Sequence, residues 1–448
     1  MSEAAPSSVS TTPAIWWRHD PTLLRVVTDL LAGELALARP GRPPAAPPWP
    51  RVCHLANDFG ADSLELLAMA TALAEALHLG AADAAKAVDA PDATDATDAD
   101  AADADARLLA SPVLDDWVAA ARAGLDAAGG GQALTFRTSG SAGTPKRCTH
   151  TLATLWQETR VLAGLLPDRK RILSAVPAHH IYGFLFTVLL PRALGIDEIV
   201  DLRSAGPSAA LAMLRPGDLV VAHPGWWEAL ARLQPGFGPD IAGVSSTAPC
   251  PDALADELGA AGLRLVQVYG SSETAGVGWR AAGGAPFTLF PHWQEAEGEP
   301  ALLRQMPDGG TAHCPLQDKL DWIDGRRFRP AGRIDQAVQV GGINVFPGYV
   351  ADVLRMHPAV AEASVRLMRP DEGRRLKAFI VPRAAYIAEL AADRADSEGD
   401  VHAALAEALS AWVGERLATP ERPAAWTFGE RLPRQASGKP ADWIIDAG

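Results

Sequence analysis

One stretch of the chain concentrates groups that bind phosphate. Residues 135–146 read T-F-R-T-S-G-S-A-G-T-P-K, so hydroxyls and glycines come together and end in Lys146. Glycines let successive backbone N–H groups point at one place, hydroxyls add donors, and the lysine adds a positive charge, which together suit a polyphosphate. Pro145 stands where a Walker A loop needs glycine, so the loop is of another kind. An ordinary Gly/Ser-rich surface loop is the alternative.

A second stretch offers a carboxylate that could hold a cation beside such a phosphate. Residues 268–274 read V-Y-G-S-S-E-T. An apolar strand is expected to end there, the chain to turn at Gly270, and Glu273 to project where the sheet opens. Magnesium prefers oxygen ligands and is often held by a carboxylate together with phosphate oxygens. The alternative is a β-turn with an exposed glutamate.

Three more stretches stand out further along the chain: V-S-S-T-A-P-C-P at 244–251, G-R-I-D at 332–335 and L-P-R-Q-A-S-G-K at 432–439. In this order, the five stretches resemble the motifs of the adenylate-forming (AMP-binding) superfamily, which includes acyl- and aryl-CoA ligases, adenylation domains of peptide synthetases and luciferases. The resemblance covers residues 134–448. In one departure, Ala142 stands where the family usually has a second hydroxyl, so a phosphate or metal contact is missing or falls to Ser141.

The resemblance implies an ATP-dependent acid–thiol ligase of the EC 6.2.1 type. In such enzymes a carboxylate attacks the α-phosphate of magnesium-bound ATP to give acyl-AMP and pyrophosphate, and a pantetheine thiol then takes the acyl group. Lys439, Glu273 and Lys146 would be catalytic, and Glu273 would hold Mg²⁺. The residues that would bind the nucleotide are Thr138, Ser139, Gly140, Ser141, Gly143, Thr144, Thr247, Ala248, Pro249, Tyr269, Gly270, Ser271, Ser272, Thr274, Asp318 and Arg333.

The same resemblance assigns residues to the second step. Asp335 would be the hinge about which a small C-terminal domain rotates, and Gly341 and Gly342 would line the tunnel for the thiol. A simple tight turn is the alternative for the two glycines, and both interpretations can hold. Two departures weaken the match, because Val350 replaces the usual glutamate after this turn and Leu316-Gln317 replace the usual Thr-Gly before Asp318.

The acid pocket is less readable than the nucleotide site. Residues 177–184, P-A-H-H-I-Y-G-F, resemble the family stretch that forms a pocket wall, with His180 at the matching position and Tyr182 beside it. Trp226 and Trp227 could add a flat slot, although core packing is the favoured interpretation for tryptophans. A wall of histidine and aromatic side chains favours a compact ring over a long acyl chain.

The N-terminal third resembles an acyl carrier protein rather than a ligase. Asp62-Ser63-Leu64 matches the triplet at which carriers receive phosphopantetheine, and the helical patterns at 21–37 and 113–121 would be the first and last carrier helices. Ser63 is thus a candidate modification site, with phosphopantetheine as the implied cofactor. The alternative is a plain helix capped by Asp62 or Ser63.

The order of elements predicts an α/β fold: a large N-terminal domain with mostly parallel sheets and helices, plus a small mobile α+β lid. Short apolar strands alternate with helices after residue 134, which favours a parallel sheet with ligands at the carboxyl ends of its strands. The predicted divisions are residues 1–127, helical and carrier-like; 128–331, the AMP-binding core; and 332–448, the lid. An Ala/Asp-rich insertion at 81–106 has few large apolar residues and is expected to be disordered.

Composition excludes several classes of function. The 448 residues carry a net charge of −14, which disfavours duplex nucleic acid as the main partner. The four cysteines lie far apart without metal-ligand spacing, which fits reduced thiols. Neither a signal peptide nor a membrane span is visible, so a cytoplasmic protein is expected.

The combined patterns predict activation of an aromatic acid of the hydroxybenzoate type. A short ligase with a carrier-like N-terminal segment resembles the ligases of aryl polyene and xanthomonadin pigment clusters, which load such acids onto a separate acyl carrier protein. Free CoA as the acceptor is the first alternative, and a non-catalytic nucleotide-binding scaffold is the second. The sequence names neither the acid nor the oligomeric state.

Overall fold

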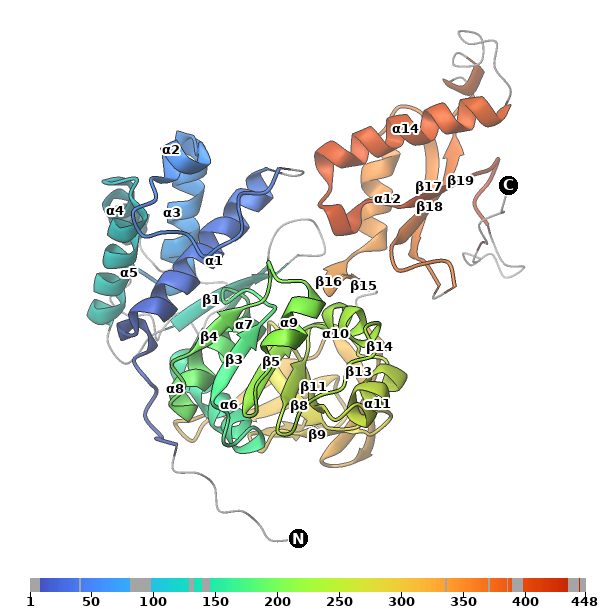
Figure 1. The fold of residues 1–448 in the computed structure, drawn as a ribbon. Helices are drawn as coiled ribbons and strands as arrows, with labels where there is room; N and C mark the ends of the chain where they lie inside the picture. Colours follow the sequence, from blue (N-terminus) through green and yellow to red (C-terminus); the bar gives the residue numbers. More distant parts are fainter. Residues whose placement is uncertain are drawn as a thin grey trace. The chain divides into compact units, whose positions relative to one another are not determined.

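The computed structural model divides the chain into two compact units (Figure 1). The first holds the described residues up to Thr138 and from Lys146 to Gly332, and the second those from Arg333 on. The described residues are 9–39, 42–80, 98–128, 133–138, 146–334, 337–369, 371–384, 386–388, 398–433 and 443. Within these ranges, no helix is both long and apolar enough to cross a bilayer.

A nine-stranded sheet forms the centre of the first unit, in the order β13-β14-β9-β8-β7-β6-β5-β3-β4. Its strands are β3 (Arg171–Ser174), β4 (Ile199–Asp201), β5 (Asp218–Ala222), β6 (Ala242–Ser245), β7 (Arg264–Ser271), β8 (Ala275–Arg280), β9 (Phe287–Leu289), β13 (Asp318–Asp324) and β14 (Arg327–Arg333). Pairing is parallel from β4 to β7 and antiparallel from β7 through β8 and β9 to β14. The α/β prediction is confirmed, but the sheet is mixed rather than mostly parallel, because only short turns join β7, β8 and β9.

Helices separate the parallel strands, as the alternation in the sequence predicts. They are α6 (Leu152–Leu165), α7 (Ile181–Phe184), α8 (Leu190–Leu194), α9 (Pro207–Met213), α10 (Pro224–Ala231) and α11 (Asp252–Ala260). A π-helical turn, Leu185–Leu189, joins α7 directly to α8. Pro191 has no N–H for the carbonyl of Thr187 four residues earlier, and the guanidinium of Arg25 donates to that carbonyl instead.

Two smaller sheets complete the first unit. One is the hairpin of β1 (Ala133–Thr138) and β2 (Lys146–Thr151), and the other contains β10 (Trp293–Glu295), β11 (Ala301–Gln305) and β12 (Thr311–Pro315). The strand β2 begins at Lys146, at the end of the glycine-rich stretch, and no motif in the sequence marked it. The stretch therefore connects two antiparallel strands, and the helix α6 begins only after Thr151, whose hydroxyl caps it.

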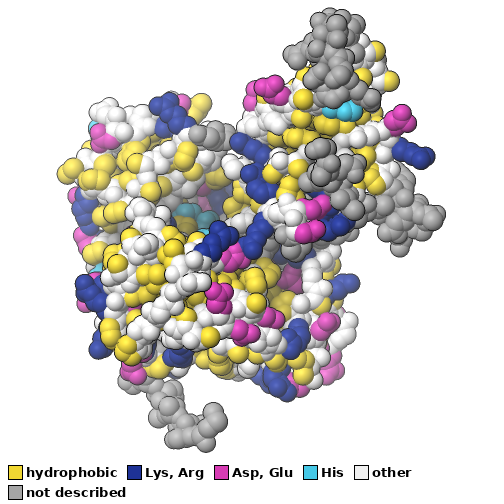
Figure 2. All heavy atoms as spheres, turned by 45° about the vertical axis from the view of Figure 1, so that its right-hand side comes forward, with side chains coloured by type: hydrophobic (Ala, Val, Ile, Leu, Met, Phe, Trp, Pro, Cys, Tyr) yellow, Lys and Arg dark blue, Asp and Glu magenta, His cyan; other side chains and the backbone are white. Residues whose placement is uncertain are grey.

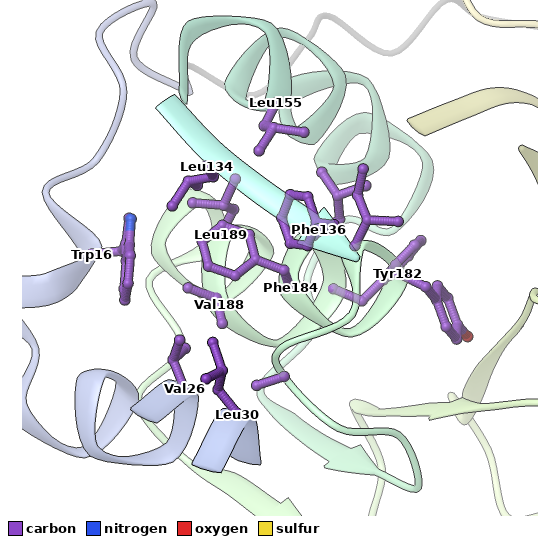
Figure 3. Packing of buried hydrophobic residues seen from close by; sticks show 14 of the residues in the cluster. Trp16, Val26, Leu30, Leu134, Phe136, Leu155, Tyr182, Phe184, Val188 and Leu189 are labelled. Carbon is purple, nitrogen blue, oxygen red and sulfur yellow. The ribbon is translucent and has the colours of Figure 1, made fainter. Parts of the chain in front are cut away.

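The N-terminal helices share a core with this sheet. They are α1 (Asp20–Ala38), α2 (Leu55–Phe59), α3 (Ser63–Leu77), α4 (Asp98–Leu109) and α5 (Leu114–Ala128), preceded by a 3₁₀ turn (Trp16–Arg18). Figure 3 shows Val26 and Leu30 of α1 beside Val188 of the π-helical turn, and Trp16 meets the ring of Phe184 edge-on at 5.2 Å. This segment and the sheet thus belong to one compact unit.

The Ala/Asp-rich insertion differs from the expectation in its second half. Residues from Asp98 on form α4, with Ala104 and Leu108 buried, whereas residues 81–97 lie outside the described part of the chain. Alanine has the highest intrinsic helix propensity, so an alanine-rich sequence forms a helix once a neighbour covers one side of it. Composition alone therefore misjudged this stretch.

The second unit is a small α+β domain with its own core. Its sheets are the hairpin β15 (Val338–Val340) and β16 (Ile343–Val345), and the three strands β17 (Val360–Leu367), β18 (Leu376–Pro382) and β19 (Ala425–Phe428). Helices α12 (Pro347–Arg355) and α14 (Glu398–Arg416) supply buried residues such as Leu354 and Leu409 to its core. The α+β prediction is confirmed, and the mobility of this unit stays a prediction.

The start of α3 gives a test of which residue caps it. Asp62 Oδ1 accepts hydrogen bonds from the N–H groups of Leu64 and Glu65 at 2.9 Å each, whereas Ser63 is exposed in the first turn. We expect Asp62→Ala to lower the free energy of unfolding by about 1 kcal/mol in chemical denaturation. Ser63→Ala is the control and should change it by less than about 0.5 kcal/mol. An equal loss in both variants contradicts this assignment.

Candidate active site

The β7–β8 hairpin presents the predicted cation ligand. The strand β7 runs through Ser271, and the turn comes at Ser272–Thr274 rather than at Gly270. Gly270 packs so closely that an added Cβ would lie 2.1 Å from the carbonyl oxygen of Ala275, which explains the glycine. The hydroxyls of Ser271 and Thr274 lie 3.1 Å apart, and Thr274 is buried, so its side chain stabilises the turn, while its role in nucleotide binding stays a prediction.

Lys146 and Glu273 meet in an ion pair although 126 residues separate them in the chain. Lys146 Nζ lies 3.0 Å from Glu273 Oε1, and the carboxylate is three-quarters buried. Burial by itself would raise the pKa of Glu273, but the Lys146 ammonium and nearby hydrogen-bond donors outweigh it and hold the pKa below its ordinary value. The carboxylate is therefore ionised near neutral pH. The structure thus brings together two of the three residues predicted to be catalytic.

A buried histidine fixes the two hairpins to each other. His150 lies on the same face of β2 as Lys146, and its Nε2 donates to the carbonyl of Ser272 at 2.7 Å. Burial lowers the pKa of His150 to about 4, so the ring is neutral at physiological pH. Sequence analysis missed this residue, and its signal was the period-two spacing from Lys146 along a strand.

Behind the turn lies a second buried group that sequence analysis missed. Arg304 of β11 donates to the carbonyl of Thr274 at 3.1 Å and to that of Thr154 at 2.8 Å. Glu158 of α6 accepts from the N–H of Gly276, and burial raises its pKa to about 8 despite the nearby Arg304. No local motif marks either residue, because each acts through the fold.

Two residues predicted to hold the nucleoside also meet. The hydroxyl of Tyr269 donates to Asp318 Oδ2 at 2.6 Å, although the sequence around Asp318 departs from the family pattern. Tyr269 also packs beside Phe287 and Phe328, at 5.7 and 5.4 Å between ring centroids. An aromatic ring and a carboxylate so arranged suit a base and a ribose.

The turn after β6 is conformationally unusual. Thr247, at φ +77°, is a β-branched residue in the left-handed region, which costs conformational energy. The neighbouring Ser246 hydroxyl donates to the carbonyl of Val268 at 2.9 Å and ties this turn to β7. Ala248 and Pro249 complete the exposed turn at the carboxyl end of β6, where open sheets bind ligands.

The predicted acid pocket is only partly supported. Tyr182 is buried, and its hydroxyl donates to the carbonyls of Ala222 and Val244 at the ends of β5 and β6, at 2.9 and 3.0 Å. His180 is exposed at the start of α7. Trp227 is fully buried and donates to the carbonyl of Val244, which agrees with the favoured interpretation of core packing rather than with a place in the pocket wall.

Two features bear on how this pocket could be built. Trp226 is half-buried, meets Trp227 edge-on and packs against the hydrophobic cluster that contains Trp227. Asp29 of α1 accepts from the N–H of Ala178 at 2.6 Å and so holds the segment before His180. Figure 2 shows histidine side chains set back in a recess of the larger unit, bordered by hydrophobic ones.

The remaining predicted residues lie in the second unit or outside the described residues. Arg333 ends β14, and Gly341 and Gly342 form the two-residue turn between β15 and β16 with φ of +61° and +84°. Such a turn requires positive φ at both positions, which explains both glycines. The predicted residues outside the described part are Ser139, Gly140, Ser141, Gly143, Thr144, Asp335 and Lys439; the side chain of Thr138 is likewise not described.

Comparisons with known proteins identify the family of this chain. The model of the AMP-binding enzyme family matches residues 48–300, and that of the AMP-binding enzyme C-terminal domain matches residues 349–439. The chain belongs to the AMP-binding enzyme family. It is an acid–thiol ligase of the acyl- or aryl-CoA type that works through an acyl-adenylate, so the predicted superfamily and enzyme class are confirmed.

Relatives of this AMP-binding enzyme align along most of its length. A 4-coumarate–CoA ligase from Halorhodospira halophila is 38% identical over 422 residues, or 93% of this chain and 97% of the relative. One from Rhodobacter capsulatus is 43% identical over 316 residues, covering 69% of this chain and 74% of the relative. Because 93% of this chain aligns with the first relative, most of the N-terminal segment has a counterpart in that relative.

Solved structures share the fold. An amide bond synthetase from Marinactinospora thermotolerans has a TM-score of 0.55 at 19% identity and covers 93% of this chain, which in turn covers 92% of it. A double mutant of o-succinylbenzoate CoA synthetase from Bacillus subtilis has a TM-score of 0.54 at 22% identity. The match covers 68% of this chain and 67% of that one. Both agree with a large α/β domain followed by a smaller one.

The buried His150 makes a pH prediction. Its folded-state pKa of about 4 lies below the ordinary 6.5, so between these values the unfolded chain binds a proton that the folded one does not. Stability is thus lost as pH falls, by about 2 kcal/mol between pH 7 and pH 5 from this group. Chemical denaturation at both pH values should show that, between pH 7 and pH 5, the His150→Gln variant loses about 2 kcal/mol less of its free energy of unfolding than the wild type does. His292 is also buried, which lowers its pKa to about 3, but it contributes equally in both proteins and so cancels from the comparison. An equal pH dependence in the two proteins contradicts the prediction.

Proposed function

We propose that this enzyme activates a ring-bearing acid of the hydroxycinnamate type as its acyl-adenylate and transfers the acyl group to CoA. The observation that carries the proposal is the Lys146–Glu273 ion pair, which places a cation and an ionised carboxylate together at the open end of the sheet. The nearby Tyr269–Asp318 pair supplies groups for a nucleoside. The acid class and CoA come from the names of the 4-coumarate–CoA ligases that align with the chain.

The described residues fit ATP with magnesium. No group of three or more His, Cys, Asp or Glu in the described part of the chain could hold a metal alone. One carboxylate with phosphate oxygens is, however, the usual environment of Mg²⁺ in nucleotide sites, and Glu273 is held ionised for it. The bound ion would screen the negative charge of the phosphates during displacement.

In the first step, the chain's residues position and neutralise. Lys146 would leave Glu273 for a phosphate oxygen, Asp318 would accept from the ribose hydroxyls, and the strained turn at Thr247 would meet the adenine. Lys439 would bridge the acid carboxylate and the α-phosphate while negative charge accumulates there. Positioning and charge neutralisation are the main demands of this chemistry.

In the second step, the thiol attacks the acyl carbonyl and AMP leaves. The turn at Gly341–Gly342 presents backbone without side chains, so a slender pantetheine arm could pass it. Rotation of the second unit about Asp335 would exchange Lys439 for this turn. Domain rotations of this kind often limit turnover.

The acceptor and the acid have competing candidates. The relatives' names favour CoA over a carrier protein, so the carrier-linked hydroxybenzoate ligase of pigment pathways becomes the second candidate. The exposure of Ser63, in the Asp-Ser-Leu triplet at the start of α3, favours this second candidate, because an exposed serine can receive a phosphopantetheine group. The division into a carrier-like segment, a core and a lid likewise stays a proposal.

A panel assay tests the proposal. ATP–pyrophosphate exchange should occur with 4-coumaric acid and fall for benzoic, hydroxybenzoic and medium-chain fatty acids. Thioester formation should then be faster with CoA than with a phosphopantetheinylated carrier protein. Exchange with hydroxybenzoate alone, or transfer only to the carrier, would favour the second candidate, and no exchange with any acid in a protein that binds ATP would contradict both.

Lys439 gives a variant that separates the two steps. Lys439→Ala should lower the rate of pyrophosphate exchange about 10³-fold, because a cation aimed at developing charge contributes on the order of 4 kcal/mol. When presynthesised acyl-adenylate is supplied, thioester formation should stay within about threefold of the wild type. The control is Lys319→Ala, which removes an exposed lysine of β13 and should leave both steps unchanged. Lys377 is buried and therefore does not serve as a control. Equal loss of both steps contradicts the assignment.

A further inference from the structure

The β1–β2 hairpin has two faces with different partners. One face carries Lys146 and His150, which contact the β7–β8 turn. The opposite face carries two cross-strand pairs, Thr135 with Thr149 and Arg137 with Arg147. This second face meets the C-terminal end of α3 (Figure 1), a helix that no step above has used.

The pair Arg137–Arg147 requires a counterion. Two like charges directly opposite each other on neighbouring strands repel and destabilise the pairing. Glu75, in the last turn of α3, lies between them: its Oε2 accepts from Arg137 Nε at 3.1 Å, and its Oε1 pairs with Arg147. The Glu75 side chain is only 17% exposed and that of Arg137 is 31% exposed, so solvent screens this contact weakly, whereas Arg147 is 66% exposed and its contact is screened more strongly.

Two more contacts secure the same face. His78, which ends α3 in the left-handed conformation at φ +49°, lies 2.9 Å from the Thr135 hydroxyl through its Nε2, and Thr135 lies 2.8 Å from the Thr149 hydroxyl. Glu34 of α1 accepts from Arg137 Nη1 at 3.2 Å. Carboxylates and a ring from two N-terminal helices therefore hold both strands of the hairpin.

We propose that Glu75 is a positioning residue for nucleotide binding: it holds β1 and β2 together by neutralising Arg137 and Arg147, and so fixes Lys146 at the edge of the hairpin. This inference rests on the proposed role of Lys146 in binding ATP. Glu75 touches neither Lys146 nor Glu273, and its effect is transmitted through the register of the two strands. When its charge is removed, Arg137 keeps Glu34, but Arg147 loses the carboxylate it pairs with and still faces a second guanidinium, which weakens the pairing of the strand ends.

Calorimetric titration with Mg·ATP, without any acid, tests the proposal on the full chain. Glu75→Gln should weaken ATP binding about tenfold, the loss expected when a charge-assisted contact worth roughly 1.4 kcal/mol is removed. In steady-state assays the KM for ATP should rise while the KM for the acid stays unchanged. A purely structural defect would move both constants together.

Arg147 provides the matched control. Arg147→Gln removes the repulsion as well as one partner, so it should bind ATP within about threefold of the wild type. In that background Glu75→Gln should cost less than about threefold, because no like-charge pair remains to be neutralised. This rescue distinguishes charge neutralisation from simple loss of packing.

The outcomes separate the two proposals. A wild-type protein that does not bind Mg·ATP overturns the proposed function and, with it, the role of Glu75. Wild-type binding with an unchanged Glu75→Gln variant, or an equal loss in the double variant, overturns the role of Glu75 alone. If Glu75→Gln does not fold, Glu75→Asp, which keeps the charge on a shorter side chain, should bind about threefold more weakly, and wild-type affinity there overturns the proposal.

Discussion

The ion pair between Lys146 and Glu273 joins two hairpins that belong to different sheets. Each charge is neutralised by the other, so both side chains are already ordered before a nucleotide binds, which lowers the entropy cost of binding. A polyphosphate with its cation would replace this contact by two similar ones, with little change in local charge. Such exchange lets a mostly buried carboxylate stay ionised without destabilising the fold.

Sequence patterns were enough for the elements and motifs but not for the contacts between them. Periodicity found α1, α3 and the parallel strands, and the resemblance of the motifs to a known family singled out Lys146, Glu273, Tyr269 and Asp318, which the structure joins in two pairs. The patterns favoured core packing for Trp227, as observed, but did not reveal that the Thr274 hydroxyl is used within its own turn or that His150 joins the two hairpins. Those facts depend on which elements become neighbours, and residues such as Arg304 that act across long sequence distances leave no local pattern.

The N-terminal helices are structural parts of the ligase unit. Asp29 of α1 supports the segment that leads to His180, and Glu75 of α3 supports the hairpin of Lys146. Whatever its ancestry, the Asp62-Ser63-Leu64 helix therefore has a packed C-terminal end and an exposed N-terminal one. The resemblance to a carrier protein rests on the exposed end, whereas the contacts with the sheet are made by the other.

The guanidinium of Arg25, which replaces the N–H that Pro191 lacks, has a consequence for dissecting the enzyme. A chain shortened to begin after α1 would lose the Arg25 donor to the Thr187 carbonyl and the Asp29 acceptor of the Ala178 N–H. Such a fragment would be less stable because these hydrogen bonds are missing, and a loss of activity in it would say nothing about the catalytic residues. A chimera that takes its first helix from another protein would keep this contact only if the new helix also places a donor such as Arg25 opposite the turn that contains Pro191.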